Sequence, residues 1–320
     1  MKELFTLRLK IFTDQFSLTW GIRKRFERGI VQINHMRFLG YDKDDDGNLI
    51  INEEQAKTIK RIYTEYLNGK GANRIAKELE ADGVLTGTGK TKWYESSVLK
   101  ILSNEKYKGD ALLQKTYTVD FLSKKRVINN GEVPSYYVKN SHPAIIDDNL
   151  WEAVQLEPQR RKDFIAEHQI YKLDYATIEN PFAGRVFCGE CGSRYGRKVW
   201  NSTNERLRRY VWQCDKKYRV KGEIGCMNGH VVDLALREGF VEAYNRVIDS
   251  SYILKDHLDD QIQSENVLEK FRGQQLTYVI KSGIKLKEFN IDIFHRYVEK
   301  VIIKNNSMVF YFLTGIEIEI

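Results

Sequence analysis

The chain has 320 residues, 42% of them hydrophobic and 30% charged, with only 4 prolines and a formal net charge of +7. This composition excludes a disordered or collagen-like chain, and the length predicts two or three domains, each with its own core. The positive charge is compatible with an anionic partner but is modest. The positions of the charges in the chain must therefore show whether the protein binds such a partner.

The N-terminal segment predicts an amphipathic helix. Charged residues such as Lys2, Arg8 and Asp14 interrupt its apolar residues, which a signal peptide would keep together. No stretch of the sequence approaches the roughly 20 consecutive apolar residues that cross a bilayer. We therefore expect a cytoplasmic protein with no membrane partner.

This first helix is expected to end at Gly29, after a basic stretch that contains Arg23, Lys24 and Arg25. Positive side chains near a helix C-terminus are stabilised by the helix dipole. The same three residues also suit contact with a DNA backbone, and the sequence leaves both roles open.

An acidic turn follows, between residues 39–42 and 49–51 of a predicted hairpin. Its acidic residues match the spacing of an EF-hand calcium loop. However, Gly40 stands where an entering helix should end, and Ile50 occupies a position where a polar ligand is usual. We expect a solvated turn, with calcium binding as the alternative. The matching residues are Asp42, Asp44, Asp46, Gly47, Leu49 and Glu53.

Three short helices are predicted next. Asn52 suits an N-cap, and apolar residues recur at helical spacing up to Leu67 and again around Ile75. The third helix, at residues 93–102, would bury Val98, Ile101 and Leu102. Because a loop joins the last two helices, they resemble a helix-turn-helix, and the third is the predicted recognition helix.

The remaining elements are predicted more coarsely. Residues 107–148 read as strands and turns, residues 150–161 as a helix, and a boundary is expected between about 165 and 182, where Asn180 and Pro181 break the pattern. We then expect a helix through Phe240, a polar helical region at about 252–283, a short helix at 294–298 and a hairpin that pairs 301–304 with 308–312.

Four cysteines form the strongest motif. Two are separated by two residues, a third follows after 22 residues and the last after 11 more. In a reducing compartment such a set suits one tetrahedral, structural zinc ion and not disulfides. His230 is an alternative fourth ligand, and four unrelated buried thiols are the non-functional alternative. The predicted ligands are Cys188, Cys191, Cys214 and Cys226.

Within the cysteine module, ten basic residues but only Glu205 and Asp215 lie between positions 194 and 221, and aromatic residues are interleaved. A small ribbon with many cations is suited to following nucleic-acid phosphates. A solvated surface is the ordinary alternative, and an RNA-binding ribbon is another. The predicted contacts are Arg194, Arg197, Lys198, Arg206, Arg208 and Arg209.

The order of these features resembles the C-terminal two-thirds of a large serine recombinase, the family of phage integrases and mobile-element resolvases. The resemblance covers nearly everything from Trp20 onward. It is carried by the cysteine ribbon and by the segments TWGIRKRFERG, FLGYDKDDDGNLIINEEQAKTIKRIY, IAKELEADGVLT and KWYESSVLKILSNEKYKGDALLQKTYTVDF.

The resemblance implies an α+β multidomain protein that binds an attachment-like site in double-stranded DNA. Residues 1–30 would be the remnant of a long linking helix, 38–165 a recombinase DNA-binding domain, and 180–320 a zinc-ribbon DNA-binding domain. The latter would contain a short helical insertion at 249–285 and a C-terminal β-hairpin. In this family the basic helix end follows the DNA backbone, and the predicted recognition helix offers Tyr94, Ser96, Ser97 and Lys100 to base edges.

Two departures from the family limit the expected activity. Only about 19 residues precede the TWGIRKR segment, and Ser17 there lies on the linking helix, so we expect no catalytic residue and no DNA cleavage by this chain. Residues 249–285 allow only short helices where the family often has a long coiled coil. A homo-oligomer or intact recombinase subunits are the expected protein partners. A stand-alone DNA-binding regulator of a mobile element is the alternative function.

Overall fold

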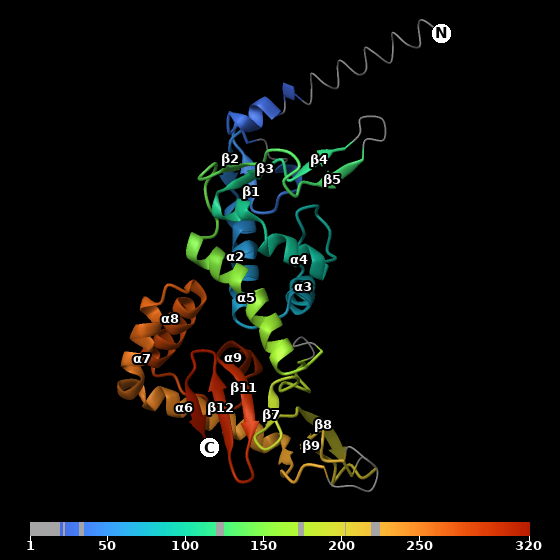
Figure 1. Ribbon diagram of the computed structural model, residues 1–320, viewed down its shortest axis with the longest axis vertical. Helices are drawn as coiled ribbons and strands as arrows, with labels where there is room; N and C mark the ends of the chain where they lie inside the picture. Colours follow the sequence, from blue (N-terminus) through green and yellow to red (C-terminus); the bar gives the residue numbers. More distant parts are fainter. Residues whose placement is uncertain are drawn as a thin grey trace, which may run out of the picture. The chain divides into compact units, whose positions relative to one another are not determined.

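The computed structural model describes residues 20–21, 23–31, 35–119, 125–171, 176–201, 203–218 and 225–320. Predictions on residues 1–19, including the linking helix around Ser17, lie outside this part. The chain divides into two compact units, one of Met1–Ile62 and Lys77–Trp151, the other of Tyr63–Ala76 and Glu152–Ile320. Both contain helices and small sheets, so the fold is α+β (Figure 1).

The first described helix ends as the sequence predicts. Residues 23–27 are helical, and Gly29 has a φ of +70°, a conformation that glycine adopts without steric conflict. The Gly29 N–H donates to the Phe26 carbonyl at 2.9 Å, and the Ile30 N–H donates to the Arg25 carbonyl at 2.9 Å. These bonds satisfy carbonyls that the helix end would otherwise leave unpaired.

The hairpin and the cap of the next helix are also as predicted. Strand β1 (Tyr41–Lys43) pairs antiparallel with β2 (Leu49–Ile51). The Asn52 side-chain oxygen accepts from the Gln55 N–H at 3.0 Å and caps α2 (Glu53–Leu67).

Two more short helices follow, α3 (Ala72–Ala81) and α4 (Glu95–Leu102). Trp93 anchors the start of α4, because its indole N–H donates to the Val84 carbonyl at 2.8 Å and its backbone N–H donates to the Glu80 carboxylate at 2.7 Å. Val98 and Leu102 are buried on the inner face of α4. The remaining elements here are η1 (His35–Arg37), η2 (Glu105–Lys108), the pairs β3 (Ala111–Leu113) with β6 (Tyr136–Val138) and β4 (Thr116–Thr118) with β5 (Arg126–Ile128), and α5 (Asp148–Glu167).

The second unit is built around a four-stranded sheet in the order β13-β12-β11-β7. The closing hairpin of β11 and β12 is the predicted one, with Ile303 opposite Met308. The sequence did not predict that β7 pairs in parallel with β11, more than a hundred residues away, with Cys188 opposite Ile303. The strands are β7 (Val186–Cys188), β11 (Val298–Ile303), β12 (Met308–Phe312) and β13 (Glu317–Glu319).

Helix α6 (Asp233–Asp249) packs on this sheet, with Phe240 and Phe310 buried in one apolar cluster. Helices α7 (Ser251–Gln263) and α8 (Val267–Ser282) lie side by side as a short pair (Figure 1). The other elements are α9 (Ile291–Tyr297) and a three-stranded sheet of β8 (Tyr195–Trp200), β9 (Arg209–Cys214) and β10 (Val231–Val232).

A buried carboxylate joins α5 to α8 in this unit. The Glu157 side chain is 2% exposed and accepts from Arg160 at 2.9 Å, Arg161 at 2.6 Å and Arg272 at 2.6 Å. Burial acts to raise the pKa of Glu157, but the charges of Arg161 and Arg160 outweigh it and lower the pKa to about 2. The carboxylate therefore stays charged at neutral pH and holds three guanidinium groups together.

Replacing Glu157 by glutamine is expected to destabilise this unit by about 3–5 kcal/mol, since three clustered guanidinium groups lose their shared counter-ion. Urea unfolding measures the change. Glu54→Gln is the control, because Glu54 makes an exposed 2.7 Å pair with Lys57, and the loss of an exposed pair should change stability far less. Equal effects of the two substitutions would contradict the assignment.

Candidate metal centre and nucleic-acid interface

The four cysteine sulfurs converge on one point. They all lie within 4.8 Å of one another, with Cys188 and Cys226 at 3.6 Å and Cys191 and Cys214 at 3.4 Å. Sulfurs around a tetrahedral zinc ion with bonds of about 2.3 Å would be roughly 3.8 Å apart, whereas a disulfide requires about 2.05 Å. The arrangement therefore fits one tetrahedral metal ion.

Secondary structure brings the sulfurs together. Cys188 ends β7 and Cys214 ends β9, so the two strands carry one sulfur each to the same place. The turn between Cys188 and Cys191 closes when the Gly192 N–H donates to the Cys188 carbonyl at 2.9 Å, with Gly192 at a φ of +68°. Cys226 precedes β10, which pairs with β9.

Backbone amides surround the sulfurs. The amides of Glu190 and Cys191 donate to Cys188, that of Lys216 to Cys214 and that of Asn228 to Cys226. In three cases the donor lies two residues after the cysteine. Gly189 does not contribute in this way, because its N–H donates to the Ile303 carbonyl at 2.8 Å.

Asn228 is a site residue that the sequence did not single out. Its side chain is completely buried, and its amide nitrogen lies 3.2 Å from the Cys188 sulfur and 2.7 Å from the Ile303 carbonyl oxygen. Burial acts to raise the pKa of Cys188, but the hydrogen bonds of Asn228 and the backbone lower it to about 7. Its position two residues after Cys226 was the available signal, because the side chains of metal ligands are usually held by hydrogen-bond donors around the site.

Cys214 and Cys226 hold their protons more tightly in the absence of a cation. Burial raises the pKa of Cys214, and it raises that of Cys226 to about 11. A bound cation would stabilise the thiolate form of both, which couples metal binding to proton release. The ring of His230, the alternative ligand, packs against the Trp200 ring at a tilt of 48°, with the ring centres 4.3 Å apart.

The basic residues of the ribbon fall into two groups. Near the cysteines, Arg194 pairs with Asp215 at 2.9 Å. Arg197 stacks over the Tyr210 ring at 3.7 Å and lies 3.6 Å from the carboxylate of Asp233. These two are therefore occupied within the protein. The second group, at the outer part of the β8–β9 hairpin, is exposed and comprises Lys198, Arg206, Arg208 and Arg209.

The predicted recognition helix exposes most of its predicted residues. Tyr94 is 61% exposed, and Ser96 and Lys100 are exposed, whereas Ser97 is half-buried. The structure adds Leu99, which is exposed on the same side. Of the three residues predicted to be buried, Val98 and Leu102 are buried and Ile101 is half-buried. The place of Leu99 outside this predicted set was the signal for its exposure.

The basic helix end is partly self-paired. Arg23 and Arg25 are exposed, but the Lys24 ammonium group lies 2.6 Å from the Glu27 carboxylate.

The acidic turn at 42–48 is closed by its own side chains, because Asp44 accepts from the Asn48 backbone N–H at 2.7 Å and from its side-chain amide at 3.2 Å. A strand leads into this turn, and the entering helix of an EF-hand is not found there.

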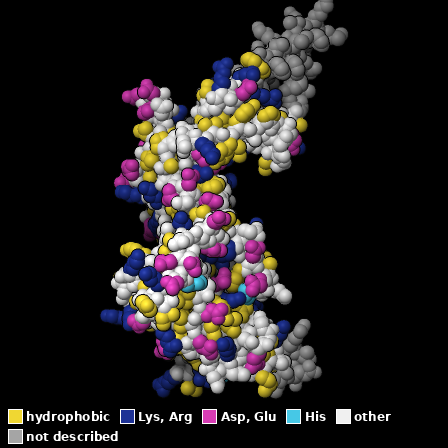
Figure 2. Space-filling model, turned by 60° about the vertical axis from the view of Figure 1, so that its left-hand side comes forward, with side chains coloured by type: hydrophobic (Ala, Val, Ile, Leu, Met, Phe, Trp, Pro, Cys, Tyr) yellow, Lys and Arg dark blue, Asp and Glu magenta, His cyan; other side chains and the backbone are white. Residues whose placement is uncertain are grey.

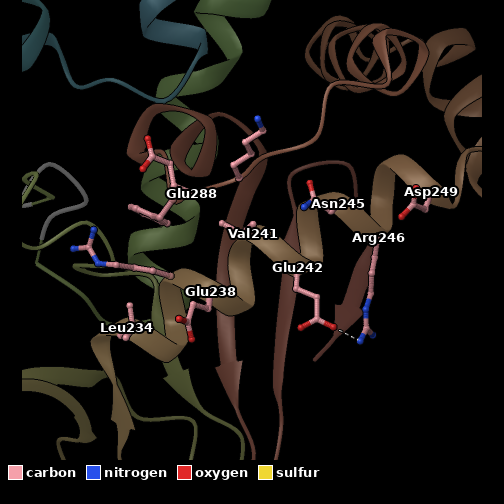
Figure 3. Close-up of a pocket in the computed structure, with 11 residues that line it drawn as sticks. Leu234, Glu238, Val241, Glu242, Asn245, Arg246, Asp249 and Glu288 are labelled. Carbon is pink, nitrogen blue, oxygen red and sulfur yellow. Dashed lines mark hydrogen bonds and ion pairs between the residues drawn. The ribbon is translucent and has the colours of Figure 1, made fainter.

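A pocket of about 750 Å³ opens along α6, beside residues 287–289 (Figure 3). Its charged lining mixes both signs, and Arg246 is already paired with Glu242. On the face in Figure 2, Lys and Arg side chains are likewise interspersed with Asp and Glu. The pocket thus suits a polyanion poorly.

Among the described helices, none combines the length and apolar character that a membrane span requires.

Comparison with known proteins places the chain in a family. A recombinase family model matches residues 53–161, and a recombinase zinc beta ribbon domain model matches residues 181–245. A solved structure described as "Sequence Requirements of the Listeria innocua prophage attP site" is 19% identical with a TM-score of 0.42, and the match covers 93% of this chain and 100% of that chain.

A second structure, described as "Crystal Structure of a LSR-DNA Complex", is 18% identical with a TM-score of 0.43, and covers 93% of this chain and 97% of that chain. The two family models span 109 and 65 residues, or 174 of the 320. They follow one another in the order that the sequence predicts. The matched domains are DNA-binding and metal-binding domains that act in DNA recombination, and they are those of the C-terminal region of a large serine recombinase. The chain therefore belongs to the recombinase family.

Proposed function

We propose that this chain binds an attachment-like site in double-stranded DNA, with α4 in the major groove and the β8–β9 hairpin along the neighbouring phosphates. The observation that carries the proposal is the outer part of this hairpin, which exposes four basic side chains beside a cluster of cysteines. Exposed cations on a short ribbon suit release of counterions from DNA. Arg23 and Arg25 would extend the backbone contacts along the DNA.

We further propose that the metal is zinc and that its role is structural. An all-sulfur, tetrahedral set is typical of structural zinc, and four protein ligands leave no position for a reacting water.

The proposed domains are 38–165 and 180–320, each with its own DNA contacts. No catalytic role is proposed for the described residues, so binding should be separable from strand cleavage. The reduced thiols suit the cytoplasm.

Removal of the metal is expected to unfold the ribbon. With the metal gone, the four sulfurs lose the ion that holds β7, β9 and the segment before β10 together. Hydrogen exchange before and after treatment with a strong chelator should show lost protection at residues 186–201, 203–218 and 225–232, restored by adding zinc. Unchanged protection in protein shown to be metal-free would contradict the proposal.

Asn228→Asp is expected to weaken zinc binding by about 10–100-fold, because the substitution replaces a donor to the Cys188 sulfur with a negative charge. Competition with a chromophoric chelator measures the affinity. Asn245→Asp is a matched control, since the Asn245 side chain bonds to Leu286 and lies on α6. Equal zinc affinities of the Asn228→Asp variant and the unchanged protein would exclude a role for this side chain.

Affinity for duplex DNA is expected to fall steeply as salt rises, and Arg208→Ala should lower the slope of log affinity against log salt by about 1. Fluorescence anisotropy over a salt series tests both. Arg246→Ala is the control, because Arg246 is exposed but paired with Glu242 on α6. A slope unaffected by either substitution would argue against phosphate contact by the hairpin.

The same preparation, incubated with supercoiled DNA that carries its site, should leave the strands intact. Recovery of recombinant DNA would contradict the proposal that binding and cleavage are separate. Preference for folded RNA over duplex DNA would favour the RNA-binding alternative.

A further inference from the structure

The outward face of α4 has a pattern that the proposed function does not explain. Ser96, Leu99, Lys100 and Ser103 are all exposed, and both Leu99 and Lys100 lie three or four residues from each of the two serines. At about 3.6 residues per turn these positions share one face of a helix. Val98 and Leu102, on the other side, are buried. Leu99 is therefore an apolar residue within an otherwise polar face.

An exposed leucine alone means little, since apolar atoms form much of any protein surface. The surroundings of Leu99 make this one informative. Ser96 and Ser103 have short side chains, and Glu95, one turn before Leu99, is half-buried, so Leu99 and Lys100 are the exposed long side chains of this face. The Ser103 hydroxyl donates to the Lys100 carbonyl at 3.4 Å and points back to the helix.

The orientation of α4 is also constrained. The two hydrogen bonds of Trp93, to the Val84 carbonyl and the Glu80 carboxylate, hold the start of the helix, and Val98 is completely buried. The helix cannot turn Leu99 inward without exposing Val98 and Leu102. The orientation of α4 therefore keeps Leu99, which is 45% exposed, at the surface, where a partner outside the chain can contact it.

The chemistry of the major groove identifies that partner. Base edges present hydrogen-bond donors and acceptors there, together with one apolar group, the C5-methyl group of thymine. A leucine side chain can neither donate nor accept a hydrogen bond, so phosphates and polar base atoms give it no favourable contact. Lys100 beside it can meet a phosphate or an acceptor on a neighbouring base.

We propose that Leu99 recognises the methyl group of a thymine and is a specificity-determining residue of α4. This inference rests on the proposed function, because it requires α4 to enter the major groove. Leu99 selects thymine over cytosine at one position of the site, while the basic hairpin contributes affinity that is independent of sequence.

The test begins with selection of bound duplexes from a random pool by the full chain. In the selected duplex each thymine is then replaced singly by deoxyuridine, which lacks only the methyl group. At one position the affinity should fall about fourfold, as loss of one buried methyl group predicts. In the Leu99→Ala variant the same replacement should have a clearly smaller effect.

Ile50→Ala is the matched control. Ile50 is 43% exposed, close to the value for Leu99, but lies on β2. This variant should keep the full sensitivity to deoxyuridine, and thermal melting should show that both variants are folded.

The inference is overturned if no thymine in the selected duplex is sensitive, or if Leu99→Ala keeps the sensitivity of the unchanged protein. Failure of the proposed function gives a different result, because no duplex is then enriched and binding shows no salt dependence. In that case the assignment of Leu99 falls as well.

Discussion

The parallel pairing of β7 with β11 is the constraint on which the metal centre depends. It places Cys188 opposite Ile303, and the Ile303 carbonyl then accepts from both Gly189 and the Asn228 side chain. The same Asn228 amide lies next to the Cys188 sulfur. One backbone carbonyl of the sheet thus holds both the first cysteine turn and the asparagine that lies two residues after the last cysteine.

The ribbon has little apolar interior of its own and gains rigidity from charge pairing at its base. The buried Trp212 indole donates to Asp233 at 2.8 Å, and Asp233 also accepts from Arg237 at 2.7 Å. Because Arg194 and Arg197 lie beside carboxylates, they help hold the hairpin. The cations further out have no carboxylate partner among the described residues, although Arg209 lies over the Trp200 ring at 5.1 Å. The total number of basic residues in the ribbon therefore overstates its unpaired charge.

Local signals predicted much of the fold. Gly29 ends its helix, Asn52 caps α2, and the hairpin of β11 and β12 forms where the sequence places it, because these features depend on neighbouring residues. The spacing of four cysteines likewise predicted a cluster that the structure bears out. Leu99 was not predicted as a contact, because the residues predicted to reach base edges were chosen for their polar groups, and Leu99 is an apolar residue on the exposed face.

The sequence by itself determined the order of the elements, the identity of the four clustered cysteines and the family, because these depend only on residue types and their spacing. Only the tertiary structure decided which groups meet across long separations. The pairing of β7 with β11, the contact of Asn228 with Cys188 and the cluster of three arginines around Glu157 are of this kind. Such contacts depend on how the chain closes on itself, and local patterns carry no signal of that closure.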